Sequence, residues 1–176
     1  MARQITLPRP PEAVSAAAAR YGPLVVLLLA GVALIVAEFL TYREIVAVTV
    51  VPEGGRTTGG SHHGYALALL GLVAMPMAVG AALGGSRPAA AALTGLGGVS
   101  LLIVLAIDLP SLDDTGLIGR TYDLAKASPQ AGFWIQLVAS FVLLAGGLLL
   151  LRRNTVSASR RSDARERKRA ALRDAE

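Results

Sequence analysis

Two carboxylates placed at apolar stretches are the first candidates for chemistry in this chain of 176 residues. Glu38 interrupts the apolar run PLVVLLLAGVALIVAEFLTY, and Asp108 closes the run LLIVLAID. Burying a charged carboxylate in so apolar a stretch is costly, so both residues are candidates for binding a proton, a cation or another ligand. Structural roles are the alternative. Glu38 is close enough to Arg43 in sequence to reach a cation or a helix end, and Asp108 could pair with Arg43 or Arg120.

Two adjacent histidines, His62 and His63, lie in the glycine-rich segment PEGGRTTGGSHHG. On a helix or a strand their side chains would diverge, but in a flexible loop both could bind one metal ion if an aspartate came near. Asp108 or the pair Asp113 and Asp114 could supply that ligand. Turn formation is the alternative for the pair, because aspartate side chains hydrogen-bond to nearby backbone in turns. His62, His63, Asp113 and Asp114 are therefore a candidate metal site.

Motifs that carry catalysis are missing from the sequence. It contains no P-loop, no HExxH pattern, no serine nucleophile elbow and no phosphate-binding glycine loop. The absence of cysteine excludes disulfides, thiolate metal sites and a cysteine nucleophile. We therefore expect a protein that is not an enzyme and that needs no cofactor.

Composition and hydrophobic patterning predict a membrane protein. Hydrophobic residues make up 53% of the chain and charged residues only 16%, whereas about a quarter of an ordinary soluble domain is charged. A helix needs about 20 apolar residues to cross the hydrocarbon core of a bilayer, and four stretches meet that length. We therefore expect an all-α bundle of four transmembrane helices. The expected spans are residues 23–42, 65–84, 88–107 and 129–151, within a transmembrane domain of residues 22–151 that is flanked by a cytoplasmic N-terminal segment (1–21) and a basic cytoplasmic tail (152–176).

The distribution of basic and aromatic residues predicts the orientation of these spans. Of the 17 basic residues, 13 lie in the two terminal segments and in the turn between the second and third spans. Because basic residues concentrate on the cytoplasmic side, both termini are expected inside the cell, with the protein in a bacterial cytoplasmic (inner) membrane. Aromatic rings favour the headgroup region, and five fall at the predicted outer ends of the spans: Phe39, Tyr42, Tyr65, Phe133 and Trp134.

The tail is expected to lie along the cytoplasmic leaflet and to contact anionic lipid headgroups. It has no aromatic residues, so we predict no specific nucleic-acid binding. Charge pairs such as Asp163 with Arg167, spaced four residues apart, favour a polar helix. The basic residues expected at the membrane surface are Arg152, Arg153, Arg160, Arg161, Arg165, Arg167, Lys168 and Arg169.

Small residues in the spans predict close packing between helices. Lipid tails are as apolar as leucine, so helices associate in a bilayer through close contact of small side chains. Gly80 and Gly84 form a GxxxG pair in the second span, and Thr94 and Gly98 form a similar pair in the third. The alternative is that a chain rich in alanine and glycine produces such spacings by chance.

Segments outside the spans carry weaker patterns. In the first outer loop, REIVAVTVV has the β-branched composition of a strand. Such a strand needs a partner in the outer loops; alternatively, the first helix continues past Tyr42 and there is no strand. In the second outer loop we expect TYDLAKAS to form a helical turn. Before the first span, a short helix is expected from Glu12, separated from the span by Gly22 and Pro23.

The order of these elements resembles a known group of proteins. EFLTYREIVAVTVV follows the first span, HHGYALALLGL opens the second, GGSRPAAAAL forms the inner turn, IDLP closes the third and GFWIQLVASFVLLAGG lies in the fourth. This layout, over residues 22 to 151, resembles small uncharacterised four-helix integral membrane proteins of actinobacteria, and it is similar to that of the tryptophan-operon-associated membrane proteins. The resemblance implies a four-helix fold and a membrane location, and it implies no activity and no functional residue.

These observations lead to one functional hypothesis and two alternatives. The leading hypothesis is a non-enzymatic integral membrane accessory or scaffold protein, part of a larger membrane assembly or a homo-oligomer. The first alternative is a small proton- or cation-coupled transporter or channel that uses Glu38, with Asp108 as a further candidate. The second alternative is a holin-like pore former, suggested by the small size and the charged tail.

Overall fold

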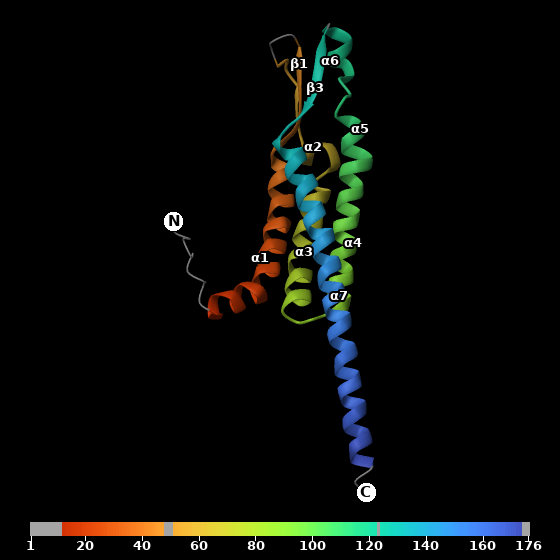
Figure 1. Cartoon of the computed structure of the whole chain (residues 1–176). Helices are drawn as coiled ribbons and strands as arrows, with labels where there is room; N and C mark the ends of the chain where they lie inside the picture. The colour runs from red at the N-terminus through yellow and green to blue at the C-terminus, as the bar shows by residue number, and fades with distance from the viewer. Residues whose placement is uncertain (1–11, 48–50, 123, 174–176) are drawn as a thin grey trace, which may run out of the picture.

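The protein is mostly helical, with a small sheet at one end of a bundle (Figure 1). The computed structural model describes residues 12–47, 51–122 and 124–173, and it describes side chains between residues 21 and 157. The longer helices are α1 (Glu12–Phe39), α3 (Ala66–Ala82), α4 (Arg87–Ile103) and α7 (Ala131–Arg173). The shorter elements are α2 (Gly59–His63), the π-helical turn η1 (Val104–Asp108), α5 (Leu109–Ser111) and α6 (Gly116–Thr121), and the strands are β1 (Thr41–Ala47), β2 (Arg56–Thr58) and β3 (Ala125–Pro129).

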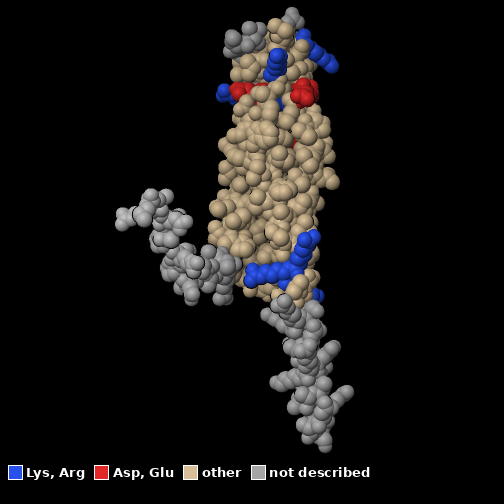
Figure 2. Space-filling model, in the orientation of Figure 1, with Lys and Arg blue, Asp and Glu red and all other residues tan. Residues whose placement is uncertain are grey.

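Three helical segments of the described chain are long and apolar enough to cross a membrane. They are Tyr21–Phe39, Arg87–Thr121 and Ala131–Ser157. The fourth apolar helix, Ala66–Ala82, has 17 residues and is shorter than these. On the face shown in Figure 2 a broad middle band is almost free of charged side chains, and the charged side chains gather at its two ends. Length, composition and charge distribution are those of a membrane protein.

The sheet has the strand order β2-β1-β3, and both pairs are antiparallel. Helix α1 ends at Phe39, so the chain does not continue as helix past Tyr42. The predicted strand therefore exists as Thr41–Ala47, while residues 48–50 of the predicted run lie outside the described part of the chain. One of its partners, β3, comes from the segment expected to form the second outer loop. The expected helical turn in TYDLAKAS is wrong over its second half, because Ala125–Ser128 pairs with Ala47–Glu44 of β1. Pairing with β1 satisfies backbone groups that an isolated turn would leave to solvent.

Helix boundaries differ from the expected spans at several places, and two of these differences concern where α7 and α1 begin. Helix α7 begins at Ala131 rather than at residue 129, because Pro129 still pairs with Arg43 at the end of β3. Helix α1 is continuous from Glu12 and contains Pro23, so the chain does not break at Gly22 and Pro23 as expected. A proline within a helix removes one backbone hydrogen bond and bends it. The first turns of α1 run at an angle to the rest of that helix (Figure 1).

The aromatic residues expected at one interface divide into two groups. Phe39, Tyr65 and Trp134 are about half exposed or more, at 65%, 48% and 54%. The rings of Phe39 and Tyr65 lie 5.5 Å apart. Tyr42 and Phe133 are buried instead, in a small apolar cluster near the sheet with Leu67, Val104 and Leu112. The exposed group fits an interfacial belt, whereas the buried pair belongs to the core.

Small residues bring the helices of the bundle close together. The core is formed by side chains such as Leu27, Leu34, Leu93 and Leu143, which are at most 1% exposed. A Cβ on Gly97 of α4 would overlap the backbone of Leu144 on α7. The α4–α7 crossing therefore has no room for a side chain at that position.

The small residues named from the sequence occupy different places. A Cβ on Gly80 would lie 3.3 Å from the Cβ of Ala89, so Gly80 is at the α3–α4 contact. Thr94 lies at the α4–α7 contact, where a Cβ on Gly147 would come within 2.7 Å of the Thr94 nitrogen. Gly84 lies beyond the end of α3, and a Cβ on Gly98 would meet only Leu144 Cδ1, at 4.0 Å.

We expect Gly97→Ala to destabilise the protein by about 1–3 kcal/mol, because the added methyl group meets backbone that cannot move aside. Gly95→Ala is the matched control in the same helix, since a Cβ there has nothing within 4 Å. It should be neutral or stabilising by up to about 1 kcal/mol, the difference in helix propensity. Unfolding of both variants in mixed detergent micelles measures the difference. Equal stability of the two variants would contradict the close approach of α4 and α7.

Candidate functional site

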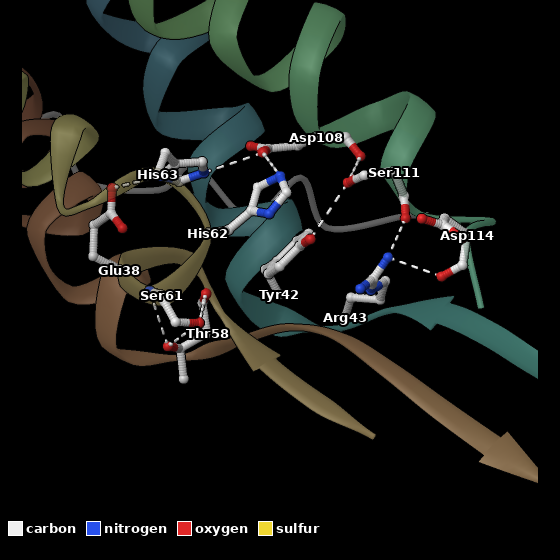
Figure 3. A network of polar contacts seen from close by, with 10 residues as sticks. All are labelled: Glu38, Tyr42, Arg43, Thr58, Ser61, His62, His63, Asp108, Ser111 and Asp114. Carbon is white, nitrogen blue, oxygen red and sulfur yellow. Dashed lines mark hydrogen bonds and ion pairs between the residues drawn. The ribbon is translucent and has the colours of Figure 1, made fainter. Parts of the chain in front are cut away.

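Glu38, His63 and Asp108 meet where the bundle joins the sheet (Figure 3). Asp108 Oδ1 lies 3.1 Å from Nε2 of His63, and Glu38 Oε1 lies 3.3 Å from Nδ1 on the other side of the ring. The second histidine, His62, has its Nε2 3.7 Å from the same Asp108 oxygen. The two carboxylates that the sequence proposed independently are therefore joined through His63.

The β1–β2 hairpin brings the histidines to Glu38. Glu38 lies in the last turn of α1, and the hairpin carries the chain away from that point and back to it. Thr58 then caps α2, its Oγ1 accepting a hydrogen bond from the Ser61 amide at 3.4 Å. Gly64 follows with a φ of 61° and Tyr65 with a φ of 63°. These two left-handed residues make the tight turn that leads from α2 into α3.

Asp108 reaches the histidines from the π-helical turn that follows α4. Helix α4 passes into η1 at Val104, and Asp108 is the last residue of that π-helical turn. A π-helical turn inserts one residue more than an α-turn, so it changes the direction of the side chains that follow. Asp108 is fully buried.

Glu38 also caps a helix. Its Oε1 accepts a hydrogen bond from the Leu67 amide at 2.9 Å, in the first turn of α3. Tyr65, the N-cap residue of α3, makes no side-chain cap hydrogen bond, so the carboxylate of another helix takes that role. The negative charge also lies at the positive end of the α3 dipole. The sequence analysis gave contact with a helix end as a structural role for Glu38, and the structure shows that contact.

The charge of the site depends on His63, whose side chain is 8% exposed. Burial alone would lower the pKa of His63. The hydrogen bond to Asp108 and the contact with Glu38 outweigh it and raise the pKa to about 9. Burial lowers the pKa of His62, with Asp108 opposing the effect and with His63 and Arg43 adding to it. At neutral pH, His63 is therefore the protonated member of the pair.

A second set of contacts ties β1 to the segment after Asp108 (Figure 3). The Arg43 guanidinium donates to the carbonyls of Ser111 at 2.6 Å and of Asp114 at 2.9 Å. The Tyr42 hydroxyl lies 3.3 Å from Ser111 Oγ, which donates to the Asp108 carbonyl at 2.7 Å. The expected pairing of the Asp108 carboxylate with Arg43 or Arg120 is wrong, because His63 occupies that place.

Several buried polar atoms around the site have no hydrogen-bond partner among the described residues. They include Glu38 Oε2, Asp108 Oδ2 and both amide atoms of Gln136. A Cβ on Gly59 would lie 3.1 Å from Glu38 Oε2 and 2.5 Å from Gln136 Nε2, so α2 covers this group with a residue that has no side chain. Buried polar groups usually bind a partner or an ordered water. The sequence showed Gln136 only as a polar residue in an apolar span, and nothing in it linked Gln136 to Glu38.

The candidate metal site does not form. Within the described part of the chain, no group of three or more histidine, aspartate or glutamate residues is placed to hold a metal ion. The histidines contact Glu38 and Asp108 rather than the aspartate pair. Asp114 Oδ1 instead accepts a hydrogen bond from the Gly116 amide at 2.8 Å, which is turn chemistry, and Asp113 is exposed.

The basic residues proposed for the membrane surface lie far from this site. Arg152 and Arg153 are exposed on α7, toward the end of the bundle opposite the sheet. Helix α7 continues through the tail to Arg173, as the charge pattern predicts. The remaining predicted residues, Arg160, Arg161, Arg165, Arg167, Lys168 and Arg169, have side chains outside the described part of the structure.

Comparison with known proteins identifies no relative: no protein-family model, curated protein or solved structure matches the chain. The resemblance to four-helix actinobacterial proteins therefore stays a prediction.

We expect the folded protein to lose stability as the pH rises through about 9. The pKa of His63 is raised above its usual 6.5, so the folded chain holds a proton that the unfolded chain releases at lower pH. The stabilisation is complete below pH 6.5 and is lost as the pH rises through the folded-state pKa. Thermal unfolding of the purified protein from about pH 6 to about pH 10 measures it.

His63→Gln should destabilise the protein at neutral pH by about 3–5 kcal/mol, because it leaves two buried carboxylates without a cation. It should also remove the fall in stability near pH 9. His62→Gln is the control: His62 has a side chain that is 27% exposed, and its removal should cost at most about 1 kcal/mol. A fall near pH 9 that persists without His63 would show that another group causes it.

Proposed function

We propose that the chain is a multi-pass protein of a bacterial cytoplasmic membrane that crosses the bilayer four times. The fourth crossing would be α3, whose 17 residues rise about 26 Å and are at the short end of the range for a transmembrane helix. It packs against both α1 and α4, which supports a place inside the same bundle. The resemblance to actinobacterial four-helix proteins is in keeping with this proposal.

In this proposal both termini are cytoplasmic and the sheet is outside. The start of α1 and the end of α7 lie on the same side of the bundle, opposite the sheet (Figure 1). Arg87, at the start of α4, donates to the carbonyls of Asn154 and Thr155 on the C-terminal half of α7, next to Arg152 and Arg153 in sequence. Figure 2 shows basic side chains below the uncharged band. The positive-inside rule assigns this side of the bundle to the cytoplasm.

We further propose that the protein is a non-enzymatic accessory or assembly factor whose outer sheet is its contact surface. The observation that carries this proposal is the joint between sheet and bundle, where His63 lies between two buried carboxylates. Beyond the joint, the bundle interior is filled by apolar side chains such as Leu34, Leu93 and Leu143. A fixed outer cap on a filled bundle suits binding to another membrane protein better than it suits conduction.

A small proton-coupled transporter is the second candidate. It is favoured by the buried polar atoms without a described partner, which continue from the site into the bundle at Gln136, Ser140 and Ser100. Such atoms could bind a short file of water molecules that carries protons. The apolar core beyond them would have to open during transport. No observation on the described residues favours the holin-like pore.

The proposed orientation can be tested with single cysteines, because the natural chain has none. Asp113→Cys should react in intact cells with a maleimide that cannot cross membranes, since Asp113 is exposed near the sheet. Ser157→Cys, which is exposed beyond the other end of the bundle, should react only after lysis. Labelling of both sites in intact cells would overturn the four-crossing proposal.

Flux measurements separate the two functions. Proteoliposomes containing the purified chain should show no proton flux above protein-free vesicles if it is an accessory protein. In that case the tagged chain should co-purify in mild detergent with one defined membrane complex. A proton flux that Glu38→Gln abolishes and that His62→Gln retains would replace the accessory proposal by the transporter.

A further inference from the structure

An apolar groove runs between α1 and α7 on the side of the bundle that faces lipid in the proposed arrangement. Two hollows of about 400 Å³ and about 420 Å³ lie along it. Both hollows are lined by Val26 and Val142, so they are neighbours along the same groove. One hollow ends at Arg153 and the other at Trp134.

The hollow that ends at Arg153 has a buried floor and exposed rims. Leu27 and Leu150 form the floor and are only 1% and 4% exposed. On the rims, Val26, Phe141 and Leu149 are 51%, 61% and 67% exposed. The lining is therefore apolar throughout until the groove reaches the arginine.

The dimensions of this hollow match one leaflet of a bilayer. From Phe141 to Arg153, helix α7 rises about 18 Å. Half of a hydrocarbon core of about 30 Å is about 15 Å. A single acyl chain of one leaflet would lie along the groove and bring its headgroup to the depth of Arg153.

Arg153 also lines a polar hollow of about 470 Å³ next to the apolar one. Arg87 lines the same hollow and is held in place, because its guanidinium donates to the Thr155 carbonyl at 2.8 Å and to the Asn154 carbonyl at 3.4 Å. Arg153 itself makes no hydrogen bond or ion pair with the residues that the structure describes. The groove thus passes from an apolar channel into a positively charged end.

We propose that this groove binds one acidic glycerophospholipid, with an acyl chain between α1 and α7 and the phosphate group at Arg153 beside Arg87. Charge complementarity selects an acidic lipid, because none of the described residues that line the two hollows at Arg153 carries a carboxylate. The hollow at the Trp134 end has no basic residue in its lining and offers no such selection. The proposed orientation places the lipid in the cytoplasmic leaflet, but the binding itself does not depend on the buried Glu38–His63–Asp108 site.

Lipid retention by the full-length protein tests this site. The chain is reconstituted in vesicles of phosphatidylglycerol and phosphatidylcholine, extracted in mild detergent and examined by native mass spectrometry. Wild type should retain one phosphatidylglycerol per chain in preference to phosphatidylcholine. Arg153→Gln should lower that retention about fivefold, the effect of about 1 kcal/mol per basic residue at a membrane surface. Arg152→Gln is the matched control, since Arg152 lines neither hollow, and its retention should stay within about twofold of wild type.

A second variant separates the acyl-chain groove from a simple phosphate site. Ala145→Leu fills the apolar hollow and keeps both arginines, so it should also lower phosphatidylglycerol retention. Unchanged retention in Ala145→Leu, or displacement of the lipid by inorganic phosphate alone, would contradict binding of an acyl chain in the groove.

Equal losses of phosphatidylglycerol retention in Arg152→Gln and Arg153→Gln would show general charge attraction instead of a site at Arg153. In a lipid-free sample, a Phe141→Cys variant that an added oxidant links into a disulfide dimer would show that a second copy of the chain occupies the groove. Unchanged thermal unfolding in phosphatidylcholine shows that each variant is folded.

Discussion

Two carboxylates buried in one small volume need a cation between them, and the His63 imidazolium is that cation. Glu38 and Asp108 are both fully buried, and His63 contacts one with each ring nitrogen. An uncompensated buried charge is costly, so the fold of the sheet end of the molecule depends on the position of His63. The hairpin must return to the end of α1, α2 must cover Glu38, and η1 must direct Asp108 inward. The same carboxylate of Glu38 also begins α3 by capping it, which links the outer end to the bundle.

The bundle depends on a different constraint. In a bilayer, helices gain little from burying apolar side chains against each other, so they associate where their backbones approach closely. Gly97 against Leu144 and Gly147 against Thr94 are such approaches on α4 and α7. The small side chain of Ala145 leaves part of the space between α1 and α7 open, in the apolar hollow described above. The packing that closes the core thus also shapes the surface presented to lipid.

Most of the helical architecture could be predicted from sequence because it depends on local pattern. Long apolar runs locate the helices, and a β-branched run after Glu38 locates β1. The pairing of β1 with β3 could not be predicted, because it joins segments about 80 residues apart, and local pattern carries no information on such contacts. For the same reason the contact of His63 with Glu38 could not be predicted. The sequence analysis named Gly98 as a packing residue of α4, whereas the close approach to α7 is at Gly97. The rotation of a helix about its own axis decides which of two adjacent residues faces its neighbour, and the spacing of small residues did not reveal that rotation.

Helix α7 has a mechanical consequence. It runs unbroken from Ala131, two residues after the sheet, to Arg173, a length of about 65 Å. Gln136 beside the ionic site and Arg153 beside the groove are therefore fixed to one stiff rod. Torque applied to the C-terminal part of α7 would turn Gln136 relative to Glu38, so a partner bound at one end of this helix could act on the other end by rotation, without a hinge between them.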